Sequence, residues 1–328
     1  MRILTTTFAY ERVGTKLRQI MPAALFVTVA APGIYACEGL AVAEEDIQPD
    51  IVWISHDAWD AKLTDLLMKV ALRSKPKWVQ GHMAGLDNAW WRKILANGTR
   101  VTKSIGAAVP IAEYVMAHAL SLIVPLDAQR DAQHAHQWMV TPFKEVNGSR
   151  WTIVGLGAIG REVALRALAF GACVSGVRRT PGEDPVLGIT YGLDEMPELL
   201  GKADVIVLAI PATRETRRMA DARFFAALKP GAILINIARG GLVDLEALRG
   251  GLESNKPGRV VLDTFEEEPL DPGSWLWDHP KVRLSAHTSW FGDKNGARMD
   301  AQFLENLARF GSGQPLLNEA SVLEAEVA

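Results

Sequence analysis

Residues 152–171 read TIVGLGAIGREVALRALAFG, and this stretch decides the fold. Three of its glycines have the spacing G-x-G-x-x-G between an apolar, strand-like run and an amphipathic, helical one. In such a turn the first glycine allows the tight bend, the second lets a pyrophosphate approach the backbone, and the third lets helix and strand pack closely. The free N–H groups of the helix N-terminus favour phosphate. The stretch therefore predicts a dinucleotide-binding unit, with these contact residues: Gly155, Gly157, Ala158, Ile159 and Gly160.

The end of the next strand-like run lacks the acidic residue that this fingerprint expects. A carboxylate about 20 residues after the turn normally binds the ribose hydroxyls of NAD. Here Arg178, Arg179 and Thr180 occupy that place. A guanidinium would bind a ribose 2′-phosphate with charge-assisted hydrogen bonds, whereas a carboxylate would repel it. We therefore expect NADP(H) as the preferred cofactor and NAD(H) as a second one; a solvated basic turn is the alternative interpretation.

Strand and helix patterns alternate along the whole chain in two series. Five strand-like runs fall within residues 2–106, with a helical run at 61–72 among them, and six more fall within residues 151–287. A long apolar helix begins near Pro110, and another helix is expected at 295–309. Such alternation predicts parallel strands with crossover helices. Since 328 residues suit two domains, we expect two doubly wound α/β domains.

Composition excludes several classes of partner. The formal net charge is −3 and no long basic run is present, so neither nucleic acid nor an anionic membrane surface is an expected partner. Cys37 and Cys173 form no disulfide or metal pattern, which favours a reducing, cytoplasmic location and no metal site. No apolar run is long enough to span a bilayer.

Three charged side chains follow later strands of the second series. Arg239 lies in INIARGGLVD, Glu268 in LDTFEEEPL and His287 in LSAHTSW. Ligands of open α/β sheets bind beyond the carboxyl ends of the strands, where these side chains should lie. A guanidinium can hold a carboxylate, an imidazole can give a proton to a carbonyl oxygen, and a glutamate can orient that imidazole. The set therefore predicts reduction of a 2-keto acid.

The order of these motifs resembles the D-isomer-specific 2-hydroxyacid dehydrogenase family, and among its members most the NADPH-dependent glyoxylate/hydroxypyruvate reductases. The glycine turn is followed by Ala238-Arg239-Gly240, then by DTFEEEP at 263–269, and then by His287 at a strand end. The loop PATRETRRM at 211–219, the stretch AGLDN at 84–88 and the stretch GQPLLN at 313–318 also match the family. The resemblance covers nearly the whole chain, most loosely over the first 75 residues.

The resemblance implies a role for each matching residue. Arg239 would bind the substrate carboxylate and carbonyl, His287 would be the general acid and base, and Glu268 would partner His287. On the cofactor side the implied residues are Pro211, Thr216, Ala238 and Asp263, the last near the nicotinamide amide. Backbone N–H groups at Ala84 and Gly85 would bind the substrate carboxylate.

The resemblance also implies the domain layout. Residues 1–103 with 292–328 would form a flavodoxin-like substrate domain, and residues 104–291 a Rossmann-type NADP-binding domain inserted into it. The active site would lie in the cleft between the two domains. A homodimer is expected, and Trp138 matches a family tryptophan in the connector that reaches toward a partner subunit.

Trp290 departs from the family pattern after the histidine. We expect it to line the substrate pocket, and we hypothesise that it shapes the pocket for an apolar or aromatic 2-keto acid instead of, or as well as, glyoxylate. A different class of function stays open at this point, because the same fold also serves as a dinucleotide-sensing, partner-binding regulatory protein. The motifs do not distinguish that reading from an enzyme.

Overall fold

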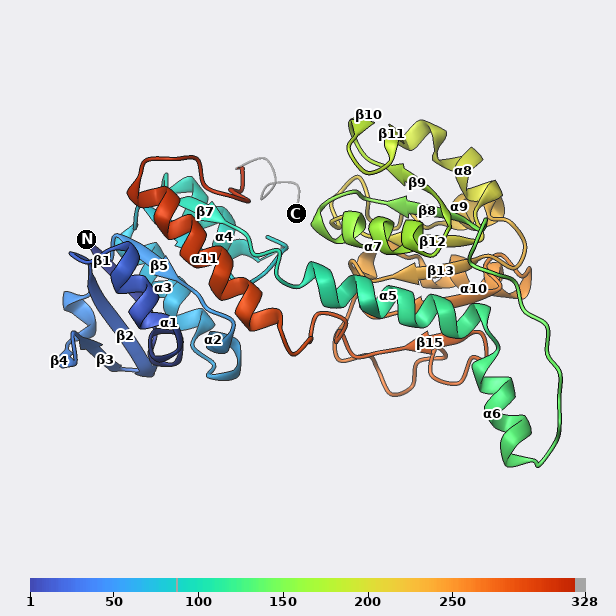
Figure 1. Ribbon diagram of the computed structural model, residues 1–328, viewed down its shortest axis with the longest axis horizontal. Helices are drawn as coiled ribbons and strands as arrows, with labels where there is room; N and C mark the ends of the chain where they lie inside the picture. Colours follow the sequence, from blue (N-terminus) through green and yellow to red (C-terminus); the bar gives the residue numbers. More distant parts are fainter. Residues whose placement is uncertain (87, 322–328) are drawn as a thin grey trace. The chain divides into compact units, whose positions relative to one another are not determined.

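The computed structural model of the chain describes residues 1–86 and 88–321 and divides into two compact units. Unit 1 is Met1–Ala107 with Asp293–Ala328, and unit 2 is Ala108–Gly292. Each unit is an open sheet covered by helices (Figure 1). The two doubly wound α/β domains expected from the sequence are thereby confirmed; their roles as substrate and cofactor domains stay predictions.

The sheet of unit 1 has the strand order β4-β3-β2-β1-β5-β6-β7. Its strands are β1 (Arg2–Thr6), β2 (Leu25–Ala31), β3 (Ile34–Cys37), β4 (Leu40–Val42), β5 (Ile51–Trp53), β6 (Trp78–Gln80) and β7 (Arg100–Thr102). The five parallel strands β2-β1-β5-β6-β7 follow the flavodoxin-like order 2-1-3-4-5. The order reverses between β1 and β5, which makes their carboxyl ends the switch point where ligands of such sheets bind.

An antiparallel hairpin extends this sheet and corrects the expectation of a purely parallel one. Strands β3 and β4 add to β2 in antiparallel sense. The turns before them use Gly33 and Gly39, both at positive φ, as tight hairpin connections require. The strands are three and four residues long, too short to give a clear alternating pattern.

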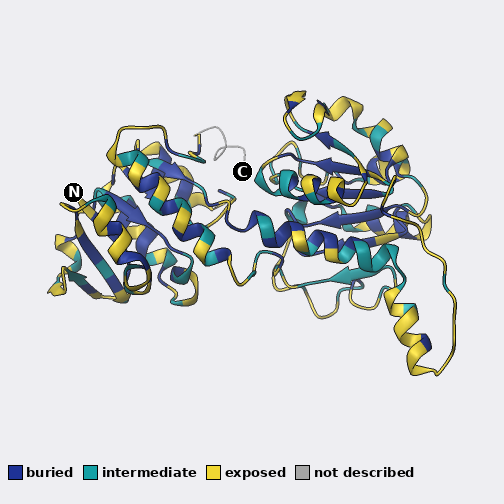
Figure 2. Ribbon diagram, in the orientation of Figure 1, coloured by how far each residue is buried: buried dark blue, intermediate teal, exposed yellow. Residues whose placement is uncertain are grey.

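Helices cover both faces of the unit 1 sheet. They are α1 (Thr7–Ile20), α2 (Asp57–Asp60), α3 (Thr64–Ser74), α4 (Ala89–Ala96) and α11 (Asn295–Gly311), with the 3-10 turn η1 (Glu44–Asp46). Adjacent strand residues point to opposite faces: Ile3 packs in the core under α1 and α11, and Leu4 in the core under α3 and α4. The dark blue strands in Figure 2 lie between these layers. On the first face, Trp53 stacks on Phe303 of α11 with ring centroids 4.1 Å apart.

The helix expected at 61–72 is displaced in the structure. The backbone takes a left-handed conformation at Lys62 (φ 54°), which ends the short α2, and α3 starts at Thr64 and runs to Ser74. The apolar spacing found the helix but not its start, because the interruption comes from backbone geometry rather than from a proline or glycine.

The sheet of unit 2 has the order β10-β11-β9-β8-β12-β13-β14-β15. The strands are β8 (Arg150–Val154), β9 (Cys173–Val177), β10 (Gly182–Asp184), β11 (Gly188–Tyr191), β12 (Val205–Leu208), β13 (Ile233–Asn236), β14 (Arg259–Leu262) and β15 (Val282–Leu284). From β11 to β14 this is the Rossmann order 3-2-1-4-5-6, and β15 continues it. The edge strand β10 pairs antiparallel with β11, which the sequence did not predict.

Helices flank this sheet as well. They are α5 (Ala108–Ile123), α6 (Leu126–His134), α7 (Ala158–Ala169), α8 (Met196–Lys202), α9 (Ala222–Ala227) and α10 (Leu245–Glu253), with the 3-10 turns η2 (Leu193–Glu195) and η3 (Gly240–Leu242). Helices α5 and α7 pack together, while α8, α9 and α10 share a buried apolar cluster with the sheet. Among the described residues no single helix is long and apolar enough to cross a membrane; α5 and α6, bent by 58° at their break, meet that criterion of length and composition only as a pair.

Candidate active site

The glycine turn has the geometry that a close-packed phosphate-binding loop requires. A Cβ on Gly160 would lie 1.8 Å from the carbonyl oxygen of Gly155, so only glycine lets α7 approach β8. Gly155 itself has φ +103°. Gly157 is the N-cap of α7, and a Cβ there would meet no described atom within 4 Å. The turn therefore leaves room beside the helix N-terminus, whose N–H groups favour an anion.

The two arginines after β9 lie at the carboxyl end of that strand. The side chain of Arg178 donates through Nη2 to the carbonyl of Glu183 (3.3 Å), while its buried Nε has no partner among the described residues. Arg179 and Thr180 are exposed. The nearby carboxylate of Asp184 is occupied, because it pairs with Arg161 of α7 (2.6 Å) and accepts the N–H groups of Val186 and Leu187. Two cationic groups thus remain at the place where NAD-binding folds present an acid.

The loop after β12, residues 211–219, is held together by hydrogen bonds of its threonines. Thr216 Oγ1 donates to the carbonyl of Pro211 (2.8 Å) and accepts the N–H of Thr213 (2.8 Å). Pro211 is exposed, and Ala238, at the end of β13, is buried. These positions give the two loops a fixed shape at the carboxyl edge of the sheet; their contact with a cofactor stays a prediction.

His287 and Glu268 are joined directly. Nδ1 of His287 lies 2.8 Å from Oε2 of Glu268, and both side chains are partly exposed. The other carboxylate oxygen of Glu268 accepts the N–H of Phe265 (2.9 Å), which fixes the glutamate. With Nδ1 engaged, Nε2 is the ring nitrogen left to exchange a proton with a ligand. The partnership expected from the sequence is thus present in the geometry.

Asp263 holds the loop that carries His287. It is fully buried, and its carboxylate accepts hydrogen bonds from Ser285 Oγ and from the N–H groups of Thr288 (2.9 Å) and Ser289 (3.2 Å). The N–H of His287 donates to the carbonyl of Asp263 (2.8 Å). These bonds support the left-handed backbone of His287 (φ 49°), a strained conformation for this residue.

Sequence reasoning missed this positioning role of Asp263, because a buried aspartate and a cofactor contact look alike in the sequence. It also missed Tyr114 of α5, whose hydroxyl is hydrogen bonded to Ser285 Oγ. Burial raises the pKa of Tyr114 to about 12, so it stays a neutral phenol at ordinary pH. Nothing in the sequence signals that a helix 170 residues away completes this network.

Arg239 stands at the start of η3, in a turn packed tightly against the loop that leads to Glu268. A Cβ on the next residue, Gly240, would lie 1.9 Å from the backbone carbon of Phe265, so this approach requires glycine. Asn236 Nδ2 donates to the carbonyl of Arg239 (2.9 Å), and Arg239 Nη1 donates to the carbonyl of Ala238 (2.7 Å). The packing of these two loops places the Arg239 turn against the loop that leads to Glu268, the partner of His287.

Trp290 is attached to the same loop. Its indole Nε1 donates to the carbonyl of His287 (2.8 Å), and its ring meets Phe291 edge to face at 5.1 Å. The indole therefore supports the histidine backbone, a role the sequence did not indicate. Its expected place in a substrate pocket stays a prediction.

In unit 1, the loop after β6 carries the expected carboxylate contacts. Ala84 is exposed and Gly85 is half-buried; Asp87 of the matched stretch 84–88 lies outside the described residues. The loop is anchored on both sides, since Ser104 N donates to the carbonyl of Met83 (3.0 Å) and Asn88 caps α4. The structure thus brings together Arg239, Glu268 and His287 in unit 2, whereas Ala84 and Gly85 belong to unit 1.

Comparison with known proteins gives a family match. Residues 116–289 match the family model described as D-isomer specific 2-hydroxyacid dehydrogenase, NAD binding domain. Among curated relatives, a D-3-phosphoglycerate dehydrogenase of Bacillus subtilis is 32% identical over 237 residues, 71% of this chain. The match covers 45% of that relative, so the chain spans about half its length.

Two solved structures are similar to this chain, one over nearly its whole length and one over about half of it. A D-isomer specific 2-hydroxyacid dehydrogenase family protein from Aeromonas salmonicida has a TM-score of 0.77 and 30% identity, with 98% of each chain covered. The apo form of an NADPH-dependent glyoxylate/hydroxypyruvate reductase from Sinorhizobium meliloti has a TM-score of 0.53 and 29% identity, covering 57% of this chain and 96% of that one.

Proposed function

Because the chain belongs to the D-isomer-specific 2-hydroxyacid dehydrogenase family, we propose that it reduces a 2-keto acid of the glyoxylate/hydroxypyruvate class to the D-2-hydroxy acid with NADPH. The observation that carries the proposal is the His287–Glu268 pair beside the Arg239 turn. The likeness to a glyoxylate/hydroxypyruvate reductase supports the substrate class.

Each residue of the cluster has a distinct task in this reaction. Arg239 holds the substrate carboxylate and carbonyl through its planar guanidinium. Glu268 accepts a hydrogen bond from Nδ1 of His287 and orients the ring, so that Nε2 delivers a proton to the carbonyl oxygen. Asp263 and Trp290 act as positioning residues, because they fix the backbone on both sides of the imidazole.

The residues of the turn fit a dinucleotide with a 2′-phosphate. When bound, NADPH supplies the hydride. The N-terminus of α7 offers N–H groups to the pyrophosphate, with Gly157 leaving space beside it. Arg178 and Arg179 bind the 2′-phosphate, because Asp184 is already neutralised by Arg161 and repels it little. Arg179, which is exposed, is accessible to that phosphate.

A panel of 2-keto acids assayed with NADPH and with NADH tests the proposal. We expect turnover of glyoxylate and hydroxypyruvate with a higher kcat/KM for NADPH. Negligible turnover of every 2-keto acid, with tight NADPH binding retained, would instead support a dinucleotide-sensing regulatory protein.

We also propose a homodimer formed through the connector after α5. The apolar side chains Leu126, Trp138, Val140 and Phe143 are all exposed there, Trp138 at 98%. Contiguous exposed apolar side chains favour association with a partner surface. Trp138→Ser with Val140→Ser should shift the mass measured by light scattering from dimer toward monomer, and a wild-type monomer at micromolar concentration would contradict the proposal.

A further inference from the structure

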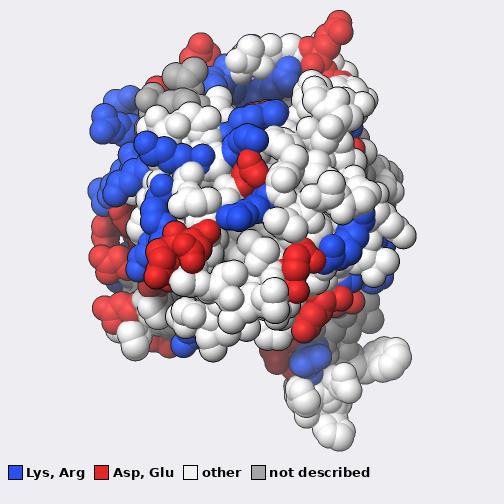
Figure 3. All heavy atoms as spheres, turned by 90° about the vertical axis from the view of Figure 1, so that its left-hand side faces the viewer, with Lys and Arg blue, Asp and Glu red and all other residues white. Residues whose placement is uncertain are grey.

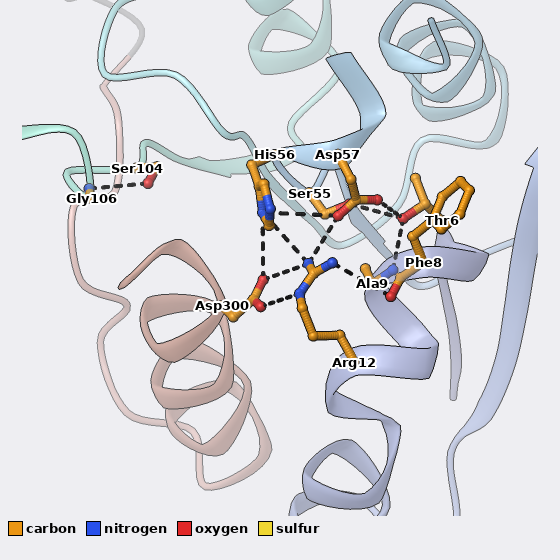
Figure 4. A network of polar contacts seen from close by, with 10 residues as sticks. All are labelled: Thr6, Phe8, Ala9, Arg12, Ser55, His56, Asp57, Ser104, Gly106 and Asp300. Carbon is orange, nitrogen blue, oxygen red and sulfur yellow. Dashed lines mark hydrogen bonds and ion pairs between the residues drawn. The ribbon is translucent and has the colours of Figure 1, made fainter. Parts of the chain in front are cut away.

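The switch point of the unit 1 sheet is filled by a network of charged side chains (Figure 4). Arg12 of α1 forms a fork with Asp300 of α11, with Nε–Oδ2 at 2.6 Å and Nη2–Oδ1 at 2.9 Å. The same Nη2 donates to Oδ1 of Asp57, which follows β5 (2.9 Å). We name Arg12, His56, Asp57 and Asp300 the switch-point array.

Two nitrogens of Arg12, Nε and Nη2, are used within this array, while Nη1 makes one long contact (3.5 Å) with the carbonyl of Phe8. Hydrogen bonds from Arg12 to Asp300, and then to Asp57, raise the pKa of the guanidinium above its usual value. Asp57 is also held from the other side, because its Oδ2 accepts the hydroxyls of Thr6 and Ser55 (3.1 Å for Ser55). The side chain of Asp300 is 6% exposed and that of Asp57 is 14% exposed, so the network belongs to the fold rather than to a mobile surface.

The charge of the array is not balanced. One guanidinium faces two carboxylates, which leaves a net charge of −1 while the histidine is neutral. His56 Nδ1 lies 3.5 Å from Nη2 of Arg12 and 3.8 Å from Oδ1 of Asp300. Its ring rests against Gly296, where a Cβ would come within 2.4 Å of Nε2. The face of the molecule in Figure 3 carries charged groups of both signs.

The neighbouring His82 adds no compensating charge. It follows β6, two residues before Ala84, and burial followed by the influence of His56 lowers its pKa to about 4. Its Nδ1 is buried and has no partner among the described residues. This edge of the sheet therefore presents a neutral imidazole and an excess carboxylate beside the loop expected to bind the substrate.

We propose that the switch-point array makes unit 1 select 2-hydroxy and 2-keto acids whose distal group is uncharged, and reject those that carry a second anionic group such as a phosphate. The inference rests on the proposed function and deepens it. Nε and Nη2 of the array's guanidinium are bound by its two carboxylates, so a distal phosphate would meet the excess negative charge of the array. A single unpaired like charge at a partly screened distance costs on the order of 1.4 kcal/mol, or about tenfold in affinity.

Calorimetric titration of the full chain, saturated with NADPH so that neither 2-hydroxy acid can be oxidised, compares D-glycerate with D-3-phosphoglycerate, which differ only in the distal phosphate. We expect D-glycerate to bind about tenfold more tightly. Asp57→Asn should narrow that ratio at least threefold, and the matched control Asp60→Asn, which removes an exposed carboxylate of the same helix, should leave it unchanged. If Asp57→Asn fails to fold, His56→Lys is the second variant, because it adds a positive charge and spares the Arg12–Asp300 fork. It should also narrow the ratio of the affinities for D-glycerate and D-3-phosphoglycerate.

Equal affinities in the wild type, including undetectable binding of both acids, would overturn the inference. So would an equal effect of Asp57→Asn and Asp60→Asn. Because binding is measured without turnover, a protein that selects D-glycerate but reduces no 2-keto acid refutes the proposed function alone. A protein that reduces hydroxypyruvate but binds both acids equally refutes this inference alone.

Discussion

The carboxyl edges of the two sheets use arginine in opposite ways. In unit 2, Arg179 is exposed after β9, so a cationic group is accessible to a ligand. In unit 1, Arg12 is bound by Asp300 and Asp57. Arginine is thus exposed in one unit and bound by carboxylates in the other, and we expect the first arrangement to bind a phosphate and the second to repel one.

The largest effect on activity should come from removing His287, the proposed proton donor at the carboxyl ends of the unit 2 strands. We expect His287→Ala to lower kcat for glyoxylate by about 10²–10⁴-fold, the usual contribution of a general acid. NADPH affinity, measured by fluorescence titration, should change less than threefold. His279→Ala, a histidine outside the cluster, is the control; an equal loss there would point to general destabilisation.

The next effect should appear when the arginines of that edge are removed. Arg178→Ala with Arg179→Ala should raise KM for NADPH about tenfold or more, since charge-assisted hydrogen bonds to the 2′-phosphate are lost. KM for NADH should stay nearly constant. Arg223→Ala removes an exposed arginine of α9 and serves as the matched variant. An unchanged KM for NADPH would make the two arginines a solvated turn.

A smaller effect is expected at the support of the histidine. Trp290→Phe removes the indole N–H bonded to the carbonyl of His287 and should lower kcat about three- to tenfold, roughly the value of one hydrogen bond. Trp290→Ala should in addition change the ranking of glyoxylate, hydroxypyruvate and phenylpyruvate by kcat/KM. If the ranking stays the same, the residue does not shape the pocket.

The smallest effect concerns stability at the unit 1 edge. Because the pKa of His82 in the folded chain is about 4, below its usual value, the unfolded chain binds a proton first as pH falls. The stabilisation is complete above pH of about 6.5 and decreases as pH falls toward 4, by roughly 2–3 kcal/mol at most. His82→Gln should therefore lose less stability than the wild type between pH 7 and pH 4.5, measured by urea unfolding. Parallel losses would refute the low pKa.

Most of the parallel framework was predictable from the sequence, because buried parallel strands are continuous apolar runs separated by helical spacing. The glycine turn and the strands on either side of it are the clearest example. The hairpin of β3 and β4 and the edge strand β10 were not predictable, since three- and four-residue strands carry too little pattern.

The functional residues also fall into two groups, those that the sequence predicted and those that it did not. Arg239, Glu268 and His287 follow predictable strands, so their common edge could be expected. The supports could not be: Asp263 and Tyr114 act through bonds to Ser285, and these depend on packing between segments far apart in sequence. The switch-point array is hidden for the same reason, because Arg12 and Asp300 are separated by 288 residues.

The central claim is an NADPH-dependent reduction of a 2-keto acid by the unit 2 edge. The most direct measurement is kcat/KM for glyoxylate and hydroxypyruvate with NADPH and with NADH, in the wild type and in the Arg178→Ala, Arg179→Ala variant. We predict that the wild type prefers NADPH and that the double variant loses this preference while it keeps turnover with NADH. No turnover with either cofactor, or a wild-type preference for NADH, would contradict the account.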